Sequence, residues 1–235
     1  MALPRINDVP MYTMTVPSTG KEVKFRPFLV KEQKVLLIAY ETQDRKQIIN
    51  SVIDCIHSCV DNQVEVNKLP IFDVDYIFTQ IRSKSVGEKA ELNLRCENCN
   101  ETTPFTIDLS EIEPPKLNEV KKDLIEINES IKIKMKYPSY TDVMQNVNSE
   151  SDEDFSVRFI ISCIDLIQTE EESIIFRDEP LEERIKFVES LTNEQFEKLS
   201  SFISNIPKLA QEVSISCDKC GTETKRTLEG MENFF

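Results

Sequence analysis

The sequence predicts an α+β protein built as two tandem pseudo-repeats, and three observations lead to this fold class. Short strand-like segments alternate with longer amphipathic helical segments along the chain. The order of these segments repeats once within the 235 residues. Each copy ends in a Cys-x-x-Cys pair between two strand-like segments. We therefore expect a first repeat over residues 1–113 and a second over residues 114–235, joined into one compact unit.

Each predicted repeat opens with a β-hairpin and continues with amphipathic helices. Turn residues at 17–20 and 128–130 separate the paired strands. The predicted strands cover residues 11–16, 22–26, 124–127 and 131–136. The predicted helices cover residues 30–42, 46–60, 70–82, 155–167, 180–190 and 193–204. The last of these helices has a capping-box start, in which Thr192 and Gln195 satisfy backbone N–H groups at the helix N-terminus.

Matched segments in the two halves carry the repeat hypothesis. The pairs are Cys96 with Cys217 at an offset of 121 residues, residues 51–56 with 159–164 at an offset of 108, and residues 23–27 with 133–137 about one repeat length apart. Their order is the same in both halves, which indicates a tandem duplication with insertions. Residues 113–116, Glu-Pro-Pro-Lys, form the predicted linker between the halves.

Four of the seven cysteines form the two Cys-x-x-Cys pairs, Cys96 with Cys99 and Cys217 with Cys220. Two thiolates separated by two residues in a tight turn can hold one tetrahedral ion, and each pair supplies half of its ligands. We therefore predict a structural zinc site with all four cysteines as ligands, shared between the two repeats. Such an ion would cross-link chain segments more than one hundred residues apart and so contribute to folding.

Two other interpretations of the pairs remain open in the sequence. A Cys-x-x-Cys pair is a redox pair when it opens a helix, whereas here each pair follows an alternating strand and precedes a threonine-rich stretch. A disulfide needs an oxidising compartment, and no secretory signal is visible at the N-terminus. The other cysteines, Cys55, Cys59 and Cys163, fall on apolar helical faces and are predicted core residues, and His57 points away from the face of the first two.

The composition argues against several classes of function. The chain carries 28 basic and 42 acidic side chains, a formal net charge of −14, which disfavours binding to phosphate backbones. A single histidine leaves little room for a His-centred triad, and four glycines without a Walker or G-x-G-x-x-G pattern argue against nucleotide-binding loops. The longest apolar run, residues 35–40, is too short to span a membrane. The sequence therefore predicts a cytosolic protein without enzymatic activity or catalytic residues.

Two segments of the first half resemble a known phage family. Residues 24–37 read KFRPFLVKEQKVLL, and residues 16–21 before them read VPSTGK. Together with the later Cys-x-x-Cys pair, they resemble the T-even-like bacteriophage baseplate hub and hub-assembly proteins, most clearly over residues 8 to about 110. The resemblance implies a non-enzymatic structural or assembly component of a contractile-tail baseplate, and it carries no catalytic residues to this chain.

The resemblance also implies partners and locations. Other baseplate or tail proteins would be the partners, with self-association left open, and the host cytoplasm during assembly and the virion baseplate would be the locations. Either the hub subunit or the assembly factor fits. The reducing host cytoplasm agrees with zinc-bound cysteines. Residues 25–28, Phe-Arg-Pro-Phe, form either a core strand edge or an interface anchor, and residues 231–235 dock either on their own core or on a neighbouring protein.

A zinc-ribbon module that binds nucleic acid or associates with transcription is the alternative function. It requires a basic stripe around the cysteine pairs. The nearest basic residues are Arg95, Lys219, Lys225 and Arg226, and acidic residues offset them at positions 91, 97, 101, 218 and 223. An enzyme, either a thiol oxidoreductase or a metal-dependent hydrolase, is a third candidate. Four thiolates argue against hydrolysis because they leave no open position on the zinc for water.

Overall fold

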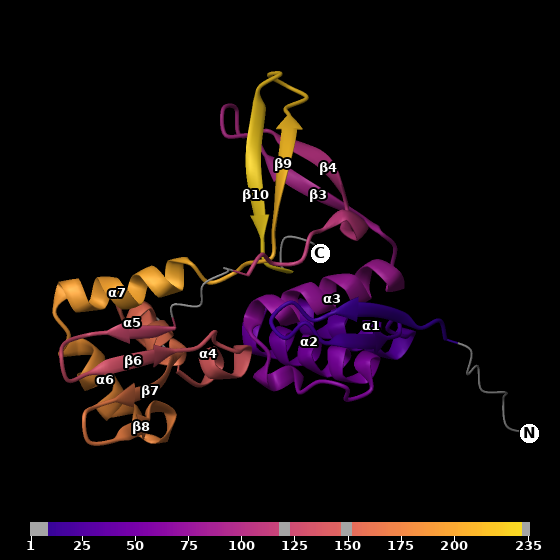
Figure 1. The fold of residues 1–235 in the computed structure, drawn as a ribbon. Coiled ribbons are helices and arrows are strands. Elements are labelled where there is room, and N and C mark those ends of the chain that lie inside the picture. The colour runs from indigo at the N-terminus through magenta and orange to yellow at the C-terminus, as the bar shows by residue number, and fades with distance from the viewer. Residues whose placement is uncertain (1–8, 118–122, 147–151, 232–235) are drawn as a thin grey trace, which may run out of the picture. The chain divides into compact units, whose positions relative to one another are not determined.

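The computed structural model of the chain contains short antiparallel sheets and helices, which is the α+β fold class that the sequence predicts (Figure 1). It describes residues 9–117, 123–146 and 152–231. The chain divides into two compact units: unit 1 comprises residues 1–66, 72–116 and 208–235, and unit 2 comprises residues 67–71 and 117–207. In the described residues, no helix has both the length and the apolar character needed to cross a membrane.

Unit 1 begins with a hairpin and three helices, close to the predicted bounds. These elements are β1 (Tyr12–Thr15), β2 (Glu22–Phe25), α1 (Val30–Glu41), α2 (Arg45–Val60) and α3 (Ile71–Ser85). Strand alternation places Val23 and Phe25 on the buried face of the hairpin. The hairpin turn is tied to α3, because the backbone N–H and the hydroxyl of Ser18 both donate to the buried carboxylate of Asp73.

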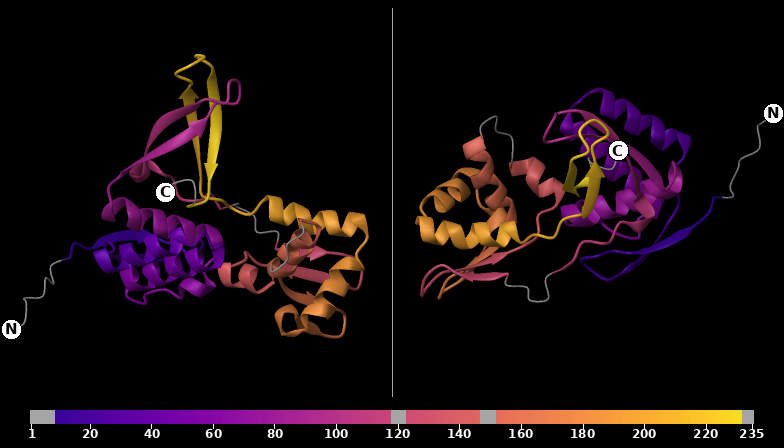
Figure 2. Two further views of the ribbon diagram at one scale, coloured as in Figure 1. Left: turned by 180° about the vertical axis from the view of Figure 1, so that it is seen from behind. Right: turned by 90° about the horizontal axis from the view of Figure 1, so that it is seen from above.

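Unit 1 also contains two hairpins that lie side by side (Figures 1 and 2). They pair β3 (Lys89–Arg95) with β4 (Thr102–Asp108), and β9 (Ala210–Ser216) with β10 (Glu223–Glu229). Each bound of the second hairpin lies 121 residues after the matching bound of the first, and the strand register is the same. Leu92, Ile107 and Val213 belong to one core cluster formed by the inner faces of both hairpins. This packing explains why the last segment of the chain belongs to unit 1.

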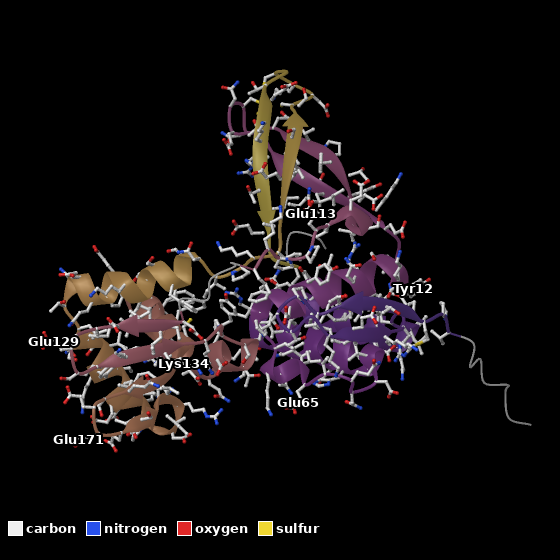
Figure 3. All side chains as sticks on the ribbon, viewed as in Figure 1. Tyr12, Glu65, Glu113, Glu129, Lys134 and Glu171 are labelled. Carbon is white, nitrogen blue, oxygen red and sulfur yellow. The ribbon has the colours of Figure 1, made fainter. Side chains whose placement is uncertain are left out.

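Unit 2 is a four-stranded antiparallel sheet with helices. The strands are β5 (Leu124–Glu126), β6 (Lys132–Met135), β7 (Ile164–Gln168) and β8 (Ser173–Ile175), paired in that order. The helices are α4 (Tyr140–Asn146), α5 (Asp152–Cys163), α6 (Leu181–Glu189) and α7 (Asn193–Ser204). Glu129 and Glu171 lie on the turns of the two hairpins in this sheet (Figure 3). Ile133, Ile160 and Leu199 lie in its core, and α7 has the predicted capping box.

Three single-turn 3-10 helices complete the fold of the described residues. They cover Val66–Lys68, Leu109–Glu111 and Phe176–Asp178. The second follows β4 directly, and Asp108 caps it by accepting a hydrogen bond from Ser110 N at 2.9 Å. Leu109 at its start is fully buried, so this turn closes one end of the core between the hairpins.

The prediction of one helix over residues 155–167 is wrong in its second part. The helix α5 ends at Cys163, and residues 164–168 continue as β7 between β6 and β8. The run from Phe159 to Ile167 is apolar except for Ser162 and Asp165, and such a run fits a buried helix and a central strand equally well. Pairing with the strands on both sides decides the outcome for its second half. The strand β8 and the short helix α4 were not predicted.

The units follow the chain differently from the predicted repeats. One boundary, after residue 116, lies at the predicted linker, but residues 67–71 belong to unit 2 and the chain returns to unit 1 from residue 208. The contact between the inner faces of the two hairpins causes this return. The predicted repeats are defined by matched segments of sequence and not by compact units, so the duplication stays a prediction.

Candidate metal centre

The structure brings together the four cysteines that the sequence selects as metal ligands. Cys96 and Cys99 lie in the turn between β3 and β4, and Cys217 and Cys220 lie in the turn between β9 and β10. The Sγ atoms of Cys96 and Cys220 are 3.7 Å apart, and those of Cys99 and Cys217 are 3.6 Å apart. All four sulfur atoms lie within 4.8 Å of one another. Each of these two short distances therefore connects a sulfur atom of one hairpin with a sulfur atom of the other.

The turn in the first hairpin has a defined backbone geometry. Cys96 N donates to Glu101 O at 2.7 Å, which continues the strand pairing up to the first ligand. Asn100 N donates back to Cys96 O at 2.9 Å. Asn100 has φ 58°, in the left-handed region that asparagine tolerates better than most residues. These bonds hold the backbone of the turn around its two thiols.

The second hairpin repeats this geometry. Cys217 N donates to Thr222 O at 3.0 Å, and Gly221 N donates to Cys217 O at 2.9 Å. Gly221 has φ 68°, and glycine adopts this conformation without strain. Each bond corresponds to one in the first turn at the same offset of 121 residues. The two turns therefore present their thiols from equivalent backbone frames.

The sulfur positions fit a tetrahedral zinc ion. A zinc–sulfur bond of about 2.3 Å places neighbouring sulfurs of a regular tetrahedron about 3.8 Å apart. Two pairs between the hairpins, at 3.6 and 3.7 Å, agree with this spacing. A disulfide needs about 2.05 Å between its sulfurs, and all seven cysteines are free thiols. Four sulfur donors are also the ligand set that zinc prefers in closed structural sites.

Side chains near the sulfurs form an outer shell that sequence reasoning missed. Asn98 Nδ2 lies 3.8 Å from Cys220 Sγ and donates to Thr222 Oγ1 at 3.3 Å. Thr222 Oγ1 is itself 3.2 Å from Cys220 Sγ. Groups of this kind orient metal ligands and tune their charge. The threonine-rich stretch after each pair was a signal for Thr222, and Asn98 had none.

The thiols differ in pKa because their hydrogen bonds and their burial differ. The side chain and backbone of Thr222 hold the pKa of Cys220 at about 6, well below the usual range. Backbone N–H groups of the turn, first that of Cys220, lower the pKa of Cys217. The backbone N–H of Glu101 acts in the same direction on Cys99, but burial and the neighbouring thiols outweigh it and raise the pKa of Cys99 to about 12. Four thiolates this close together require a bound cation to neutralise them.

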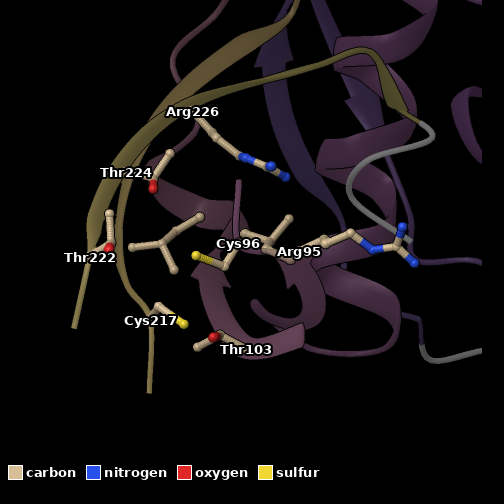
Figure 4. A pocket seen from close by; sticks show the side chains of 9 residues that line it. Arg95, Cys96, Thr103, Cys217, Thr222, Thr224 and Arg226 are labelled. Carbon is tan, nitrogen blue, oxygen red and sulfur yellow. The ribbon is translucent and has the colours of Figure 1, made fainter. Parts of the chain in front are cut away.

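A small cavity lies beside the cysteines. Thr103, Cys96 and Cys217 line it (Figure 4). Thr103 is 5% exposed, and its Oγ1 has no hydrogen-bond partner in the structure. Thr224, which lies 121 residues later, lines the same cavity from the second hairpin. The equivalence of the two hairpins therefore extends beyond the ligands.

Charged side chains around the centre pair across the two hairpins. Lys219 Nζ lies 2.5 Å from Glu101 Oε2, and Arg226 Nη2 lies 3.4 Å from Glu97 Oε1. The alternative nucleic-acid function needs such cations on a continuous basic stripe. Both are instead neutralised by acidic residues of the neighbouring hairpin, which weighs against that alternative.

The remaining sequence-selected residues lie outside the centre. Cys55, Cys59 and Cys163 are buried, as predicted, and His57 is half-buried. Phe25 is 2% exposed and belongs to the core, whereas residues 26–28 are half-buried. Met231 is buried, and residues 232–235 of the predicted docking tail lie outside the described residues. Among the described residues, the four cysteines are the one group of His, Cys, Asp or Glu side chains arranged to hold a metal ion.

The fold and the site are those of a structural protein. Four thiols from two hairpins lie within 4.8 Å of one another, so a bound metal ion would cross-link distant parts of the chain. The family model described as "T4 bacteriophage base plate protein" matches residues 9–235, and the chain belongs to this family. Membership of this family supports a structural role in a phage baseplate, a location in the virion tail and association with other phage proteins. No curated protein and no solved structure matches the chain.

Proposed function

We propose that the protein is a non-enzymatic structural or assembly component of the hub region of a contractile-tail baseplate, held together by a four-cysteine zinc centre. The convergence of four sulfur atoms within 4.8 Å of one another carries the proposal for the zinc. Membership of the baseplate family carries the proposal for the function. The hub region is the finer location that the VPSTGK and KFRPFLVKEQKVLL segments favour.

The proposed ligands are Cys96, Cys99, Cys217 and Cys220. When bound, zinc supplies a cross-link between the two hairpins, and four thiolates fill its tetrahedral shell. A filled shell leaves no position for a water molecule or a substrate, so the centre serves structure rather than hydrolysis. Asn98 and Thr222 orient the Cys220 sulfur, and the left-handed residues Asn100 and Gly221 hold the two turns.

The proposed partners are other baseplate and tail proteins, met first in the host cytoplasm during assembly. That compartment is reducing, so thiols remain available to the metal and disulfides do not persist. The proposal does not depend on whether the chain stays in the particle as a hub subunit or leaves it as an assembly factor. Mass spectrometry of purified virions separates these two roles.

The metal arm of the test measures zinc per chain in protein purified from infected cells. We expect about one zinc per chain, since one tetrahedral site uses all four thiolates. Cys96→Ser removes one ligand and should reduce bound zinc to a small fraction of the wild-type amount. Cys163→Ser is the matched control, because it removes a buried thiol of unit 2 and should keep the zinc.

The partner arm identifies what purifies with the chain from the same cells. We expect tail and baseplate proteins. Recovery of nucleic acid together with transcription proteins would overturn the function, and wild-type protein without metal would overturn the zinc centre. The two arms are independent, so each part of the proposal can fail separately.

A further inference from the structure

The outer face of α1 is apolar and exposed. Val30 is 80% exposed, Leu37 is 59% exposed and Ile38 is 54% exposed. On the opposite face, Glu32 and Ala39 are the buried residues of this helix. The sequence predicts an amphipathic helix with a buried apolar face, but α1 packs inward through few residues. Large apolar side chains gathered on one exposed helix face are typical of an interaction surface.

Two charges lie on the same outer stripe. Positions 30, 34, 37 and 41 follow the helical spacing of four, three and four residues, so they line one face. This stripe reads Val30, Lys34, Leu37, Glu41, and all four residues are exposed. Lys34 and Glu41 lie equally far from the midpoint between Leu37 and Ile38. The stripe therefore carries opposite charges at symmetric positions around an apolar centre.

We propose that this face of α1 binds the same face of a second copy of the chain, with the two helices antiparallel. A two-fold axis between Leu37 and Ile38 then places Lys34 opposite Glu41 of the partner subunit, twice by symmetry. In a two-fold interface one surface must be complementary to itself. This stripe meets that condition, because its positive and negative charges face each other when two copies pair antiparallel. A dissimilar partner would not require the two charges to be placed symmetrically.

The charge around α1 also favours a second copy. The chain has a net charge of −14, so most approaches of two copies are repulsive. Residues 9–66, which include α1, contain seven basic and seven acidic side chains, a net charge of zero. Two copies that meet through this region bring together segments that carry no net charge. A helix of 12 residues is about 18 Å long, so we expect a small interface and a reversible dimer.

Sedimentation velocity of the zinc-loaded full chain over a wide range of concentrations tests this interface. We expect wild-type protein to pass from monomer to dimer as concentration rises. Leu37→Asp should leave it monomeric. Ile175→Asp is the matched control, because it adds the same charge at an exposed apolar position of unit 2 and should leave the dimer unchanged. Circular dichroism checks that each variant is folded.

A charge swap makes the test specific for antiparallel self-pairing. Lys34→Glu should weaken the dimer at least about tenfold, since two acidic side chains then face each other twice. Adding Glu41→Lys restores the opposite charges and should restore the dimer. Wild-type and doubly swapped chains should each pair with themselves but not with one another, which fluorescence transfer between labelled chains measures. A wild-type chain that stays monomeric, a Leu37→Asp chain that still dimerises, or a double swap that does not recover would each overturn the proposal.

Discussion

The beginnings of α1 in unit 1 and α4 in unit 2 are built alike from different residues. In unit 1, Arg26 Nη2 lies 3.1 Å from Glu32 Oε1, and Glu32 Oε2 accepts a hydrogen bond from Leu29 N at 2.7 Å. The acid thus holds both the cation that follows β2 and the last backbone N–H before the helix. Burial opposes its charged form, but the hydrogen bond from Arg26 and that from Leu29 lower the pKa of Glu32.

Unit 2 repeats this arrangement at an offset of 110 residues. Lys136 Nζ lies 2.7 Å from Asp142 Oδ1, and Asp142 Oδ2 accepts a hydrogen bond from Ser139 N at 3.0 Å. Burial again opposes the charge, but the hydrogen bonds from Lys136 and Ser139 and the charge of Lys136 together outweigh it and lower the pKa of Asp142. A lysine replaces the arginine and an aspartate replaces the glutamate, yet each group keeps its role.

A backbone contact of the preceding strand is shared as well. Arg26 N donates to Cys59 O at 3.0 Å, and Lys136 N donates to Cys163 O at 2.7 Å. The sequence matches Cys163 with Cys55, whereas these bonds match it with Cys59, one helical turn later. The two donors are 110 residues apart and the two acceptors 104, so the bonds correspond in kind and the duplication stays a prediction.

The two copies differ in burial. The side chains of Arg26 and Glu32 are 18% and 8% exposed, whereas those of Lys136 and Asp142 are 29% and 27% exposed. An ion pair loses less of its strength to water when it is buried, and removing one partner then leaves a poorly solvated charge. The ion pair of unit 1 should therefore contribute more to the free energy of unfolding than the ion pair of unit 2.

The largest effect is expected at the two Cys-x-x-Cys pairs, where the copies should be equivalent. Cys96→Ser and Cys217→Ser each break the same cross-link between segments 121 residues apart. By analogy with a covalent link closing a loop of this length, the loss of stability should be about 4–5 kcal/mol in each variant. Urea unfolding of the two variants beside wild-type protein measures it. A large loss in one variant with little change in the other would show that the pairs are not equivalent.

A smaller effect should separate the two ion pairs. Glu32→Gln should lower the free energy of unfolding by about 2–3 kcal/mol, because it leaves Arg26 partly buried without its counter-charge. Asp142→Asn should lower it by about 1 kcal/mol, since Lys136 can reach water more easily. Chemical unfolding of both zinc-loaded variants compares them. Equal losses, or a greater loss in unit 2, would contradict the argument from burial.

Local signals predicted much of the fold and the candidate site. Amphipathic spacing gave α1, α2 and α3 to within a few residues, and the capping box gave the first residue of α7. The metal centre was accessible because Cys-x-x-Cys spacing already fixes half of a tetrahedral site in each turn. What these features share is a physical constraint that acts over a few neighbouring residues.

Features that depend on distant partners could not be predicted in this way. The residues of β7 form a strand because β6 and β8 pair with them on both sides, and no local signal contains that pairing. Val30 and Leu37 have the spacing of core residues, yet they are exposed because none of the described elements of unit 1 covers that face. The contact of Asn98 with Cys220 likewise joins two residues that lie 122 positions apart in the sequence.

The smallest expected difference lies at the left-handed residues of the two metal-binding turns. Gly221→Ala should lower the free energy of unfolding by about 1 kcal/mol, because a Cβ is disfavoured at φ 68°. An added Cβ there has no neighbouring atom within 4 Å, so the loss reports backbone strain rather than a clash. Asn100→Gly should change stability by only a few tenths of a kcal/mol, since asparagine already tolerates this conformation.

Thermal unfolding of these two zinc-loaded variants resolves the difference, because 1 kcal/mol shifts Tm by about 2–4 °C in a chain of this size. Gly221→Asn adds a further test, because it places in the second turn the asparagine that the first turn has at position 100. If the two turns share one backbone frame, this variant should be more stable than Gly221→Ala and close to wild type. An asparagine variant no better than the alanine variant would mean that Asn100 owes its place to interactions of its own side chain, and the equivalence of the turns would then end at the cysteines.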